Sequence, residues 1–325
     1  MSNSVKCDLC PKRCVVPPGK SGDCRIRVNI DGTLLAVTYG HPCAMHVDPV
    51  EKKPLNHFLP GTRAFSIATA GCNLHCRNCQ NWQISQASAD TTRAYSVTPA
   101  QLCNLAASNY CASIAYTYTD PAVFYEYTLA CSRAACEKDI KNIMVTAGYI
   151  NPKPFKELCK YLHAANIDLK AFSDKFYREV CGGTLKPVLN TLVNAKEAGI
   201  ELEVTNLILP TLNDSDKDIT ALCRWIKLEL GAETPLHFSK FSPRYRMRNL
   251  PPTPEKTLKR ARQIAVAEGL KYVYVGNILD TRWQSTVCPK CGKLLIKRVG
   301  YRIREQHIVN GKCPDCGTKI YGVWK

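Results

Sequence analysis

Three cysteines lie close together at a spacing that could support redox chemistry: Cys72, Cys76 and Cys79, in the pattern Cys-x3-Cys-x2-Cys. A structural zinc site usually takes four ligands, often from two Cys-x2-Cys pairs, whereas this set offers three. A cubane cluster has four irons, so three thiolates leave one iron without a protein ligand. The spacing therefore predicts a 4Fe–4S cluster with one open iron.

A second set of cysteines lies near the C-terminus and has the spacing of a zinc ribbon. Two Cys-x2-Cys pairs, each followed by glycine one residue later, can provide four thiolates in tetrahedral geometry. The sequence predicts structural zinc here, with iron as the alternative, bound by Cys288, Cys291, Cys313 and Cys316.

A third set lies near the N-terminus and is less regular. It can hold zinc or an auxiliary 4Fe–4S cluster, and its ligands are Cys7, Cys10, Cys14 and Cys24. The remaining eight of the 19 cysteines are scattered, and we expect them to be small buried apolar residues: Cys43, Cys103, Cys111, Cys131, Cys136, Cys159, Cys181 and Cys223.

The charge of the chain is strongly basic, with a formal net charge of +17 over 325 residues. Residues 281–325 alone hold ten Lys or Arg and two acidic residues, a net +8. Such a segment suits tRNA or an acidic partner protein, although a solvated charged face explains it equally well. No apolar run is long enough to cross a bilayer and the N-terminus has no signal-peptide pattern, so we expect a cytoplasmic protein without membrane attachment.

Composition divides the chain into three regions. Residues 1–60 are rich in Cys, Pro and Gly and predict a metal-binding module, residues 281–325 predict a zinc-ribbon-like module, and residues 61–280 alternate strand and helix patterns. Alternation of this kind predicts an α/β fold with a parallel sheet, either doubly wound or closed as a partial barrel. The strands are expected at 64–69, 112–118, 142–146, 166–170, 201–208, 235–241 and 271–275, and the helices at 98–109, 121–136, 153–164, 186–198, 215–229 and 254–268.

Polar side chains recur on one face of these strands. In the segment 166–170, alternation places Asp168 and Lys170 together, opposite two apolar residues. The pairs Glu203 and Thr205, and His237 and Ser239, repeat this pattern on two later strands. One such pair could be a structural ion pair, but three strands predict a shared polar cavity.

The cysteine motif and several other segments resemble a known family. Cys-x3-Cys-x2-Cys is the signature of radical S-adenosylmethionine (SAM) enzymes, and the approach Pro60–Arg63 resembles that of pyruvate formate-lyase activating enzymes. Over nearly its whole length the chain resembles the radical SAM member of the AmmeMemoRadiSam system, in DPVEKKPLNHFLPG (48–61), YTYTDP (116–121), DLKAF (168–172), HFSKFSP (237–243), YVYVGN (272–277) and the closing CPDCG.

The resemblance implies a partial (β/α)6 barrel with the 4Fe–4S cluster and SAM at the carboxyl ends of its strands. It also implies SAM contacts from Thr119 and Asp120, where relatives have Gly-Gly-Glu, and from Thr146 and Gly148. We expect Asp168, Lys170 and His237 to be catalytic. A structural histidine buried in the core would explain His237 nearly as well. Further cofactor contacts are expected from Asn78, Thr205 and Asn206.

The expected activity is reductive cleavage of SAM to methionine and a 5′-deoxyadenosyl radical that abstracts hydrogen from a substrate. The electron would come from a reductant such as ferredoxin or flavodoxin. The family suggests a small molecule or peptide handled with Memo-type and AMMECR-type partners. Three alternatives stay open: a glycyl-radical-enzyme activase, a tRNA-modifying enzyme, and a non-catalytic metal- or nucleic-acid-binding module.

Overall fold

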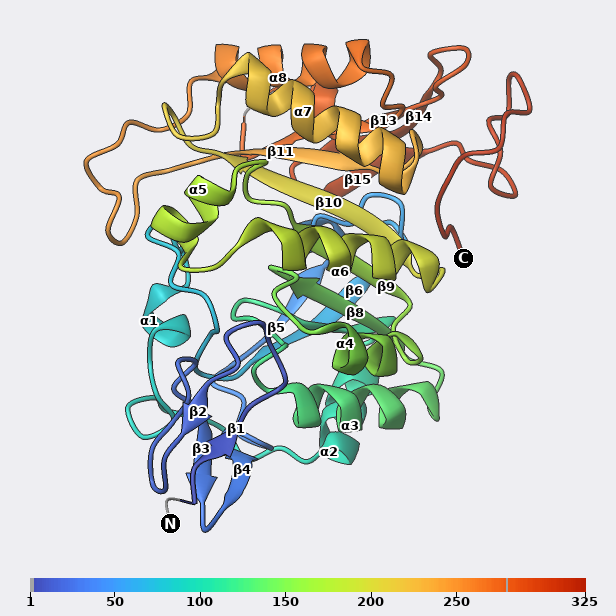
Figure 1. Ribbon diagram of the computed structural model, residues 1–325. Coiled ribbons are helices and arrows are strands. Elements are labelled where there is room, and N and C mark those ends of the chain that lie inside the picture. The colour runs from blue at the N-terminus through green and yellow to red at the C-terminus, as the bar shows by residue number, and fades with distance from the viewer. Residues whose placement is uncertain (1–2, 279) are drawn as a thin grey trace.

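The computed structural model describes residues 3–278 and 280–325, and its centre is an eight-stranded sheet (Figure 1). Seven strands run parallel and follow the chain order across the sheet. They are β6 (Arg63–Ala68), β7 (Ser113–Tyr116), β8 (Lys141–Thr146), β9 (Ala164–Asp168), β10 (Glu201–Ile208), β11 (Leu236–Lys240) and β12 (Val273–Gly276). Each coincides with a predicted strand, and the α/β fold class is confirmed.

The eighth strand, β5 (Ala44–Pro49), pairs antiparallel with β6 and forms one edge of the sheet. At the other edge is β12, and among the described residues no hydrogen-bonded ladder joins the two edges. The sheet is therefore a partial, unclosed barrel. Because β5 belongs to residues 1–60, part of the predicted N-terminal module joins the main sheet, while the boundary at residue 60 stays a prediction.

Helices connect the parallel strands and follow one another along one side of the sheet (Figure 1). At α2, Thr98 and Gln101 form a capping box and Pro99 occupies the first turn. The helical segments are α1 (Trp82–Ser85), α2 (Pro99–Ser108), α3 (Tyr125–Cys136), α4 (Pro152–Cys159), α5 (Asp174–Phe176), η2 (Tyr177–Cys181), α6 (Leu185–Glu197), α7 (Asp216–Trp225), η3 (Ile226–Leu230) and α8 (Glu255–Ala267). No helix within the described residues is long and apolar enough to span a bilayer.

The alternation within β9 and its continuation separates core from cavity. Ile167 and Leu169 are buried in the apolar cluster formed with the helices, whereas Asp168 and Lys170 line a cavity on the opposite face. Helices cover only one face of the parallel sheet, so polar side chains on the other face collect in a common space. The periodicity prediction is confirmed.

Small sheets flank the main one at both ends of the chain (Figure 1). The N-terminal hairpins are β1 (Val5–Lys6) with β2 (Val15–Val16), and β3 (Arg27–Ile30) with β4 (Thr33–Ala36). The short η1 (Val50–Lys52) leads from β5 towards β6. After η4 (Thr281–Gln284), the C-terminal ribbon contains β13 (Thr286–Val287), β14 (Leu294–Val299) and β15 (Arg302–Gln306).

The C-terminal ribbon, residues 285–325, packs into the main domain through a chain of hydrogen bonds. Arg298, which is 1% exposed, donates to Thr286 Oγ1 over 2.7 Å and to the Asn56 carbonyl over 2.7 Å. Thr286 and the Tyr274 hydroxyl are 2.8 Å apart, and the Tyr274 hydroxyl lies 2.6 Å from His57 Nε2. The ribbon is therefore joined to β12 and to the segment before β6.

Candidate active site

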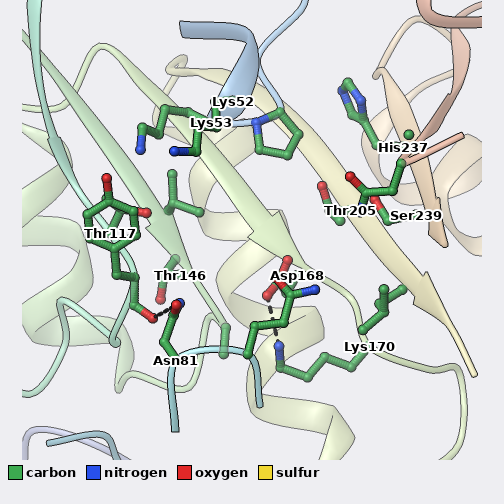
Figure 2. A pocket seen from close by; sticks show the side chains of 18 of the residues that line it. Lys52, Lys53, Asn81, Thr117, Thr146, Asp168, Lys170, Thr205, His237 and Ser239 are labelled. Carbon is green, nitrogen blue, oxygen red and sulfur yellow. Dashed lines mark hydrogen bonds and ion pairs between the residues drawn. The ribbon is translucent and has the colours of Figure 1, made fainter. Parts of the chain in front are cut away.

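A cavity of about 700 Å³ opens at the carboxyl ends of the parallel strands (Figure 2). Its volume lies within the range typical of small-molecule and cofactor sites. The carboxyl ends of parallel barrel strands are also where catalytic groups gather, because the loops after the strands converge there. Its lining includes Lys53, Cys72, Cys76, Asn78, Cys79, Asn81, Thr119, Asp120, Thr146, Asp168, Lys170, Thr205, His237, Ser239, Arg298 and Tyr301.

The three cysteines of the Cys-x3-Cys-x2-Cys motif lie on the loop after β6, and all of them line this cavity. The loop is held from outside by η2, because the backbone N–H groups of His75 and Arg77 donate to the carbonyls of Cys181 and Val180 over 2.8 and 2.9 Å. The Ser85 hydroxyl lies 3.2 Å from Cys79 Sγ. The thiols are thus fixed by backbone contacts and aimed at a common space.

Cys181, which the sequence suggested was only a buried apolar residue, lies beside this motif. Its thiol is a neighbour of the Cys76 thiol, and the proximity of Cys181 lowers the pKa of Cys76. A stabilised thiolate is the form that ligates iron. Sequence spacing could not identify Cys181, because it is 105 residues from Cys76 in the chain and reaches it only through the fold.

Asp168 and Lys170 form an ion pair in the cavity, with Lys170 Nζ 2.8 Å from Asp168 Oδ2 (Figure 2). Burial of Lys170 opposes its charge, but Asp168 together with Cys76 and Cys181 outweighs burial, and the pKa of Lys170 is raised well above its usual value. The side chain therefore presents a permanent positive charge close to the cysteine motif.

Asp120 is buried and connects the loops after β7 and β8. Its carboxylate accepts hydrogen bonds from the backbone N–H groups of Ala122 and Ala147, over 3.0 and 2.8 Å, and from the Thr146 hydroxyl over 3.0 Å. Burial raises the pKa of Asp120 although these hydrogen bonds act in the opposite direction. Much of the acceptor capacity of Asp120 is already used, so this residue positions Thr146 as well as lining the cavity.

His237 lies across the cavity and belongs to a buried polar network. Its Nε2 lies 2.6 Å from Oε2 of Glu203, a carboxylate that is fully buried, and Glu203 Oε1 accepts from the His57 backbone N–H over 2.7 Å. Burial opposes the charge of Glu203, but hydrogen bonds from both histidines lower its pKa. Because the carboxylate accepts, His237 Nε2 carries the proton.

His57 is the neutral member of this network. Burial lowers its pKa to about 4. Its Nδ1 lies 2.6 Å from the Tyr321 carbonyl and must donate, so Nε2 accepts from the Tyr274 hydroxyl. Every hydrogen bond from Arg298 through Thr286 and Tyr274 to His57 then has one donor and one acceptor.

Most of the active-site residues predicted from the sequence line the cavity, and three do not. Gly148, Asn206 and Glu203 are outside its lining, although Glu203 contacts His237. A β-carbon at Gly148 would lie 3.0 Å from Ile167 Cγ2, so this glycine packs against β9. The Asn206 amide donates to the Leu169 carbonyl over 2.7 Å and so holds the loop after β9.

Several lining residues were not predicted as site residues from the sequence. Lys53 is buried, pairs with Asp48 over 2.7 Å and lies 4.6 Å from the centre of the Tyr118 ring. Burial lowers the pKa of Lys53 to about 8. Asn81 donates to the Tyr118 carbonyl over 2.7 Å. These residues come from the segment before β6 and from loops, where neither period two nor helical periodicity applies.

The residues present fit a cluster with an open iron and a polar ligand. The cavity provides three soft sulfur donors suited to iron. Four residues that line it carry a buried polar atom without a hydrogen-bond partner among the described residues: Asn78 Oδ1, Thr205 Oγ1, Glu51 Oε2 and Arg298 Nε. Buried polar atoms are normally satisfied, so atoms of this kind suit a bound polar molecule.

The four cysteines of the C-terminal ribbon form a separate metal-binding group. All four sulfurs lie within 4.8 Å of one another, with Cys288 and Cys316 at 3.5 Å and Cys291 and Cys313 at 3.6 Å. Tetrahedral zinc with Zn–S bonds of about 2.3 Å separates its sulfurs by about 3.8 Å. The geometry fits one tetrahedral metal ion.

Comparison with known proteins agrees with this site. The model of the radical SAM superfamily matches residues 66–226. The protein MJ0808 of Methanocaldococcus jannaschii is 45% identical over 320 residues, which are 98% of this chain and 95% of that protein. The SuiB structure from Streptococcus suis bound to S-adenosylmethionine has a TM-score of 0.51 and 14% identity, over 74% of this chain and 56% of SuiB.

A second SuiB structure, with a TM-score of 0.50 and 15% identity, covers 70% of this chain and 52% of SuiB. The chain thus spans a little over half the length of SuiB, and at this identity the likeness concerns the fold alone. The superfamily model begins in β6 and includes the three-cysteine motif, Asp120, Asp168 and Lys170. This chain contains a radical SAM superfamily domain, which implies a catalytic enzyme that uses SAM and a 4Fe–4S cluster.

Proposed function

We propose that this protein cleaves SAM reductively and uses the resulting radical on a small molecule or peptide, as the radical SAM member of an AmmeMemoRadiSam system. Cys72, Cys76 and Cys79 would hold the 4Fe–4S cluster, which would provide the electron for cleavage of SAM to methionine and a 5′-deoxyadenosyl radical. The observation that carries the proposal is that all three cysteines line the same cavity as Asp168 and Lys170.

The residues near the motif would bind and orient SAM. Lys170 provides a fixed positive charge for the carboxylate of SAM, and Asp168 holds the lysine side chain in place over 2.8 Å. Thr119 and Thr146 line the same part of the cavity, and Asp120 sets the position of Thr146. Preorganised groups of this kind lose little freedom when the ligand binds.

The opposite side of the cavity would bind the substrate. It combines His237, Ser239 and Thr205 from the sheet with Arg298 and Tyr301 from the ribbon. Coverage of this side by the ribbon would help to exclude water from a reactive radical. A cavity of about 700 Å³ favours a small molecule or a peptide side chain over a folded nucleic acid.

Two further parts of the proposal concern partners. A one-electron reductant such as ferredoxin or flavodoxin would supply electrons to the cluster. Memo-type and AMMECR-type proteins would handle the substrate or the product. The formal charge of +8 over residues 281–325, which include the ribbon, suits an acidic protein surface. Binding of this kind would weaken with salt, because exposed charges are screened beyond about 8–10 Å at physiological ionic strength.

The test is anaerobic incubation of the purified protein with SAM and dithionite, followed by measurement of 5′-deoxyadenosine. The wild-type protein should form it, and a variant with Cys72, Cys76 and Cys79 all replaced by Ala should form none while it keeps its ribbon metal. The alternative of a non-catalytic metal-binding module predicts no 5′-deoxyadenosine from either protein. Equal product from both proteins would also refute the assignment.

A further inference from the structure

The four N-terminal cysteines surround a hollow of their own, separate from the active-site cavity. Cys7 and Cys24 are buried, and Cys10 and Cys14 are half-buried. All four line the hollow together with Leu9, Ala122 and Val123. Cysteines up to 17 residues apart in the chain therefore face one small space.

The backbone around these cysteines is organised to hold thiolates. The Cys7 N–H donates to the Cys14 carbonyl over 2.8 Å, which closes the first turn of the module. The Asp23 N–H lies 3.5 Å from Cys14 Sγ and donates to it. N–H groups directed at ligand sulfurs stabilise metal-bound thiolates and tune iron–sulfur clusters.

The distances between the sulfur atoms distinguish a site for one zinc ion from a site for a 4Fe–4S cluster. A single zinc ion draws four sulfurs to about 3.8 Å from one another, whereas a cubane lies between its ligands and holds them farther apart. Within the described residues, the ribbon cysteines form the group whose sulfurs all lie within 4.8 Å of one another. No three of the N-terminal sulfurs form such a group, and the same holds for the active-site motif.

We propose that Cys7, Cys10, Cys14 and Cys24 bind a second 4Fe–4S cluster. With four thiolates every iron has a protein ligand, so this cluster would have no open iron and would not bind SAM. The inference rests on the sulfur arrangement within the chain and is independent of the reaction proposed above.

The second cluster lies beside the first. A β-carbon at Gly71, the residue before Cys72, would be 2.6 Å from the Cys24 carbonyl oxygen. Asn73, the residue after Cys72, lines the N-terminal hollow, while Cys72 itself lines the active-site cavity. Gly71 and Asn73, on either side of Cys72, thus lie between the two sites.

The test uses the full-length protein with Cys72, Cys76 and Cys79 replaced by Ala, purified without oxygen and not reconstituted with iron. We expect about four irons and about four sulfides per chain, with the Mössbauer spectrum of a 4Fe–4S cluster. Addition of Cys10→Ser should abolish most of this iron. The matched change Cys43→Ser, at a half-buried cysteine outside the three sets, should leave it unchanged.

Two zinc ions and no iron in the triple variant would overturn the proposal, and so would a protein that holds the ribbon metal alone. Circular dichroism of the triple variant confirms folding before the metal is counted. Loss of SAM cleavage with retention of N-terminal iron would support this inference and the proposed active site together. Cleavage that persists in the triple variant would refute only the active-site assignment.

Discussion

Gly71 and Cys24 are packed backbone to backbone, so the loop that precedes the active-site cysteines rests on the N-terminal module. A β-carbon at Gly71 would lie 2.6 Å from the Cys24 carbonyl oxygen and 2.6 Å from Ile26 Cγ2, and Gly71 has a φ of +89°. Any other side chain would be strained there and would also collide with its neighbours. The N-terminal module therefore helps to set the position of Cys72.

Gly71→Ala should lower iron incorporation and SAM cleavage, because relief of the clash displaces either Cys24 or the loop that carries Cys72. The expected loss of stability is about 1–3 kcal/mol, typical of overpacking. Gly32→Ala is the matched control, since Gly32 has a φ of +83° with nothing within 4 Å of an added β-carbon. Iron content per chain is the measurement, and equal content in the two variants would contradict the packing argument.

Asp168→Asn should lower kcat/KM for SAM cleavage by about tenfold or more, which corresponds to about 1.4 kcal/mol. It removes the charge that holds Lys170 in the cavity at nearly constant shape. Asp139→Asn is the control. Like Asp168 and Lys170, Asp139 and Lys141 are two residues apart and form an ion pair, over 2.6 Å, but this pair lies on the surface. A variant that unfolds, or that cleaves SAM at the wild-type rate, would argue against a role at the site.

Cys291→Ser should remove the ribbon metal, which we propose is zinc, and leave iron content unchanged. Metal binding supplies much of the folding free energy of such short segments. Because Arg298 and Tyr301 line the cavity, loss of the metal should impair substrate turnover more than SAM cleavage without substrate. Cys136→Ser, at an exposed cysteine outside the metal sets, is the control. Metal analysis that finds iron in the ribbon would contradict the zinc assignment.

Glu201→Gln should raise the Tm at alkaline pH. Burial, and next the neighbouring Glu203, raise the pKa of Glu201 to about 9. A raised folded-state pKa means that stability is complete below the unfolded pKa of about 4.5 and is lost as pH rises through about 9. The variant should match wild type near pH 5 and exceed it by several degrees near pH 9. An identical dependence on pH in both proteins would show that Glu201 titrates normally, and Glu229→Gln on the surface is the control.

The parallel strands and their helices could be predicted because each carries a local signal. Alternation placed Asp168 and Lys170 on the cavity face, and the helix expected at 98–109 is α2, within one residue at each end. The edge strand β5 was not foreseen, since its partner β6 is chosen by the fold and its own alternation is weak. The sequence of a strand that is exposed at a sheet edge is hard to distinguish from that of a loop.

The site could be predicted where function fixes residue spacing, and less well where tertiary packing brings residues together. The spacing of Cys72, Cys76 and Cys79 is fixed by function in this way. Lys53, Cys181 and Arg298 reach the site or its ligands from distant segments. The ribbon had suggested a surface element, yet its Arg298 is buried and donates to the Asn56 carbonyl. Long-range contacts of this kind leave no pattern in a single sequence.

The central claim is that Cys72, Cys76 and Cys79 leave one iron open for SAM, and electron–nuclear double resonance tests it most directly. The variant Cys7→Ser with Cys10→Ser would leave the active-site cluster as the paramagnetic centre after reduction. Addition of SAM labelled with ¹⁵N at its amino group should alter the electron paramagnetic resonance spectrum and produce a ¹⁵N coupling to the cluster. An unchanged spectrum without ¹⁵N coupling, in a protein that retains its iron, would contradict the account.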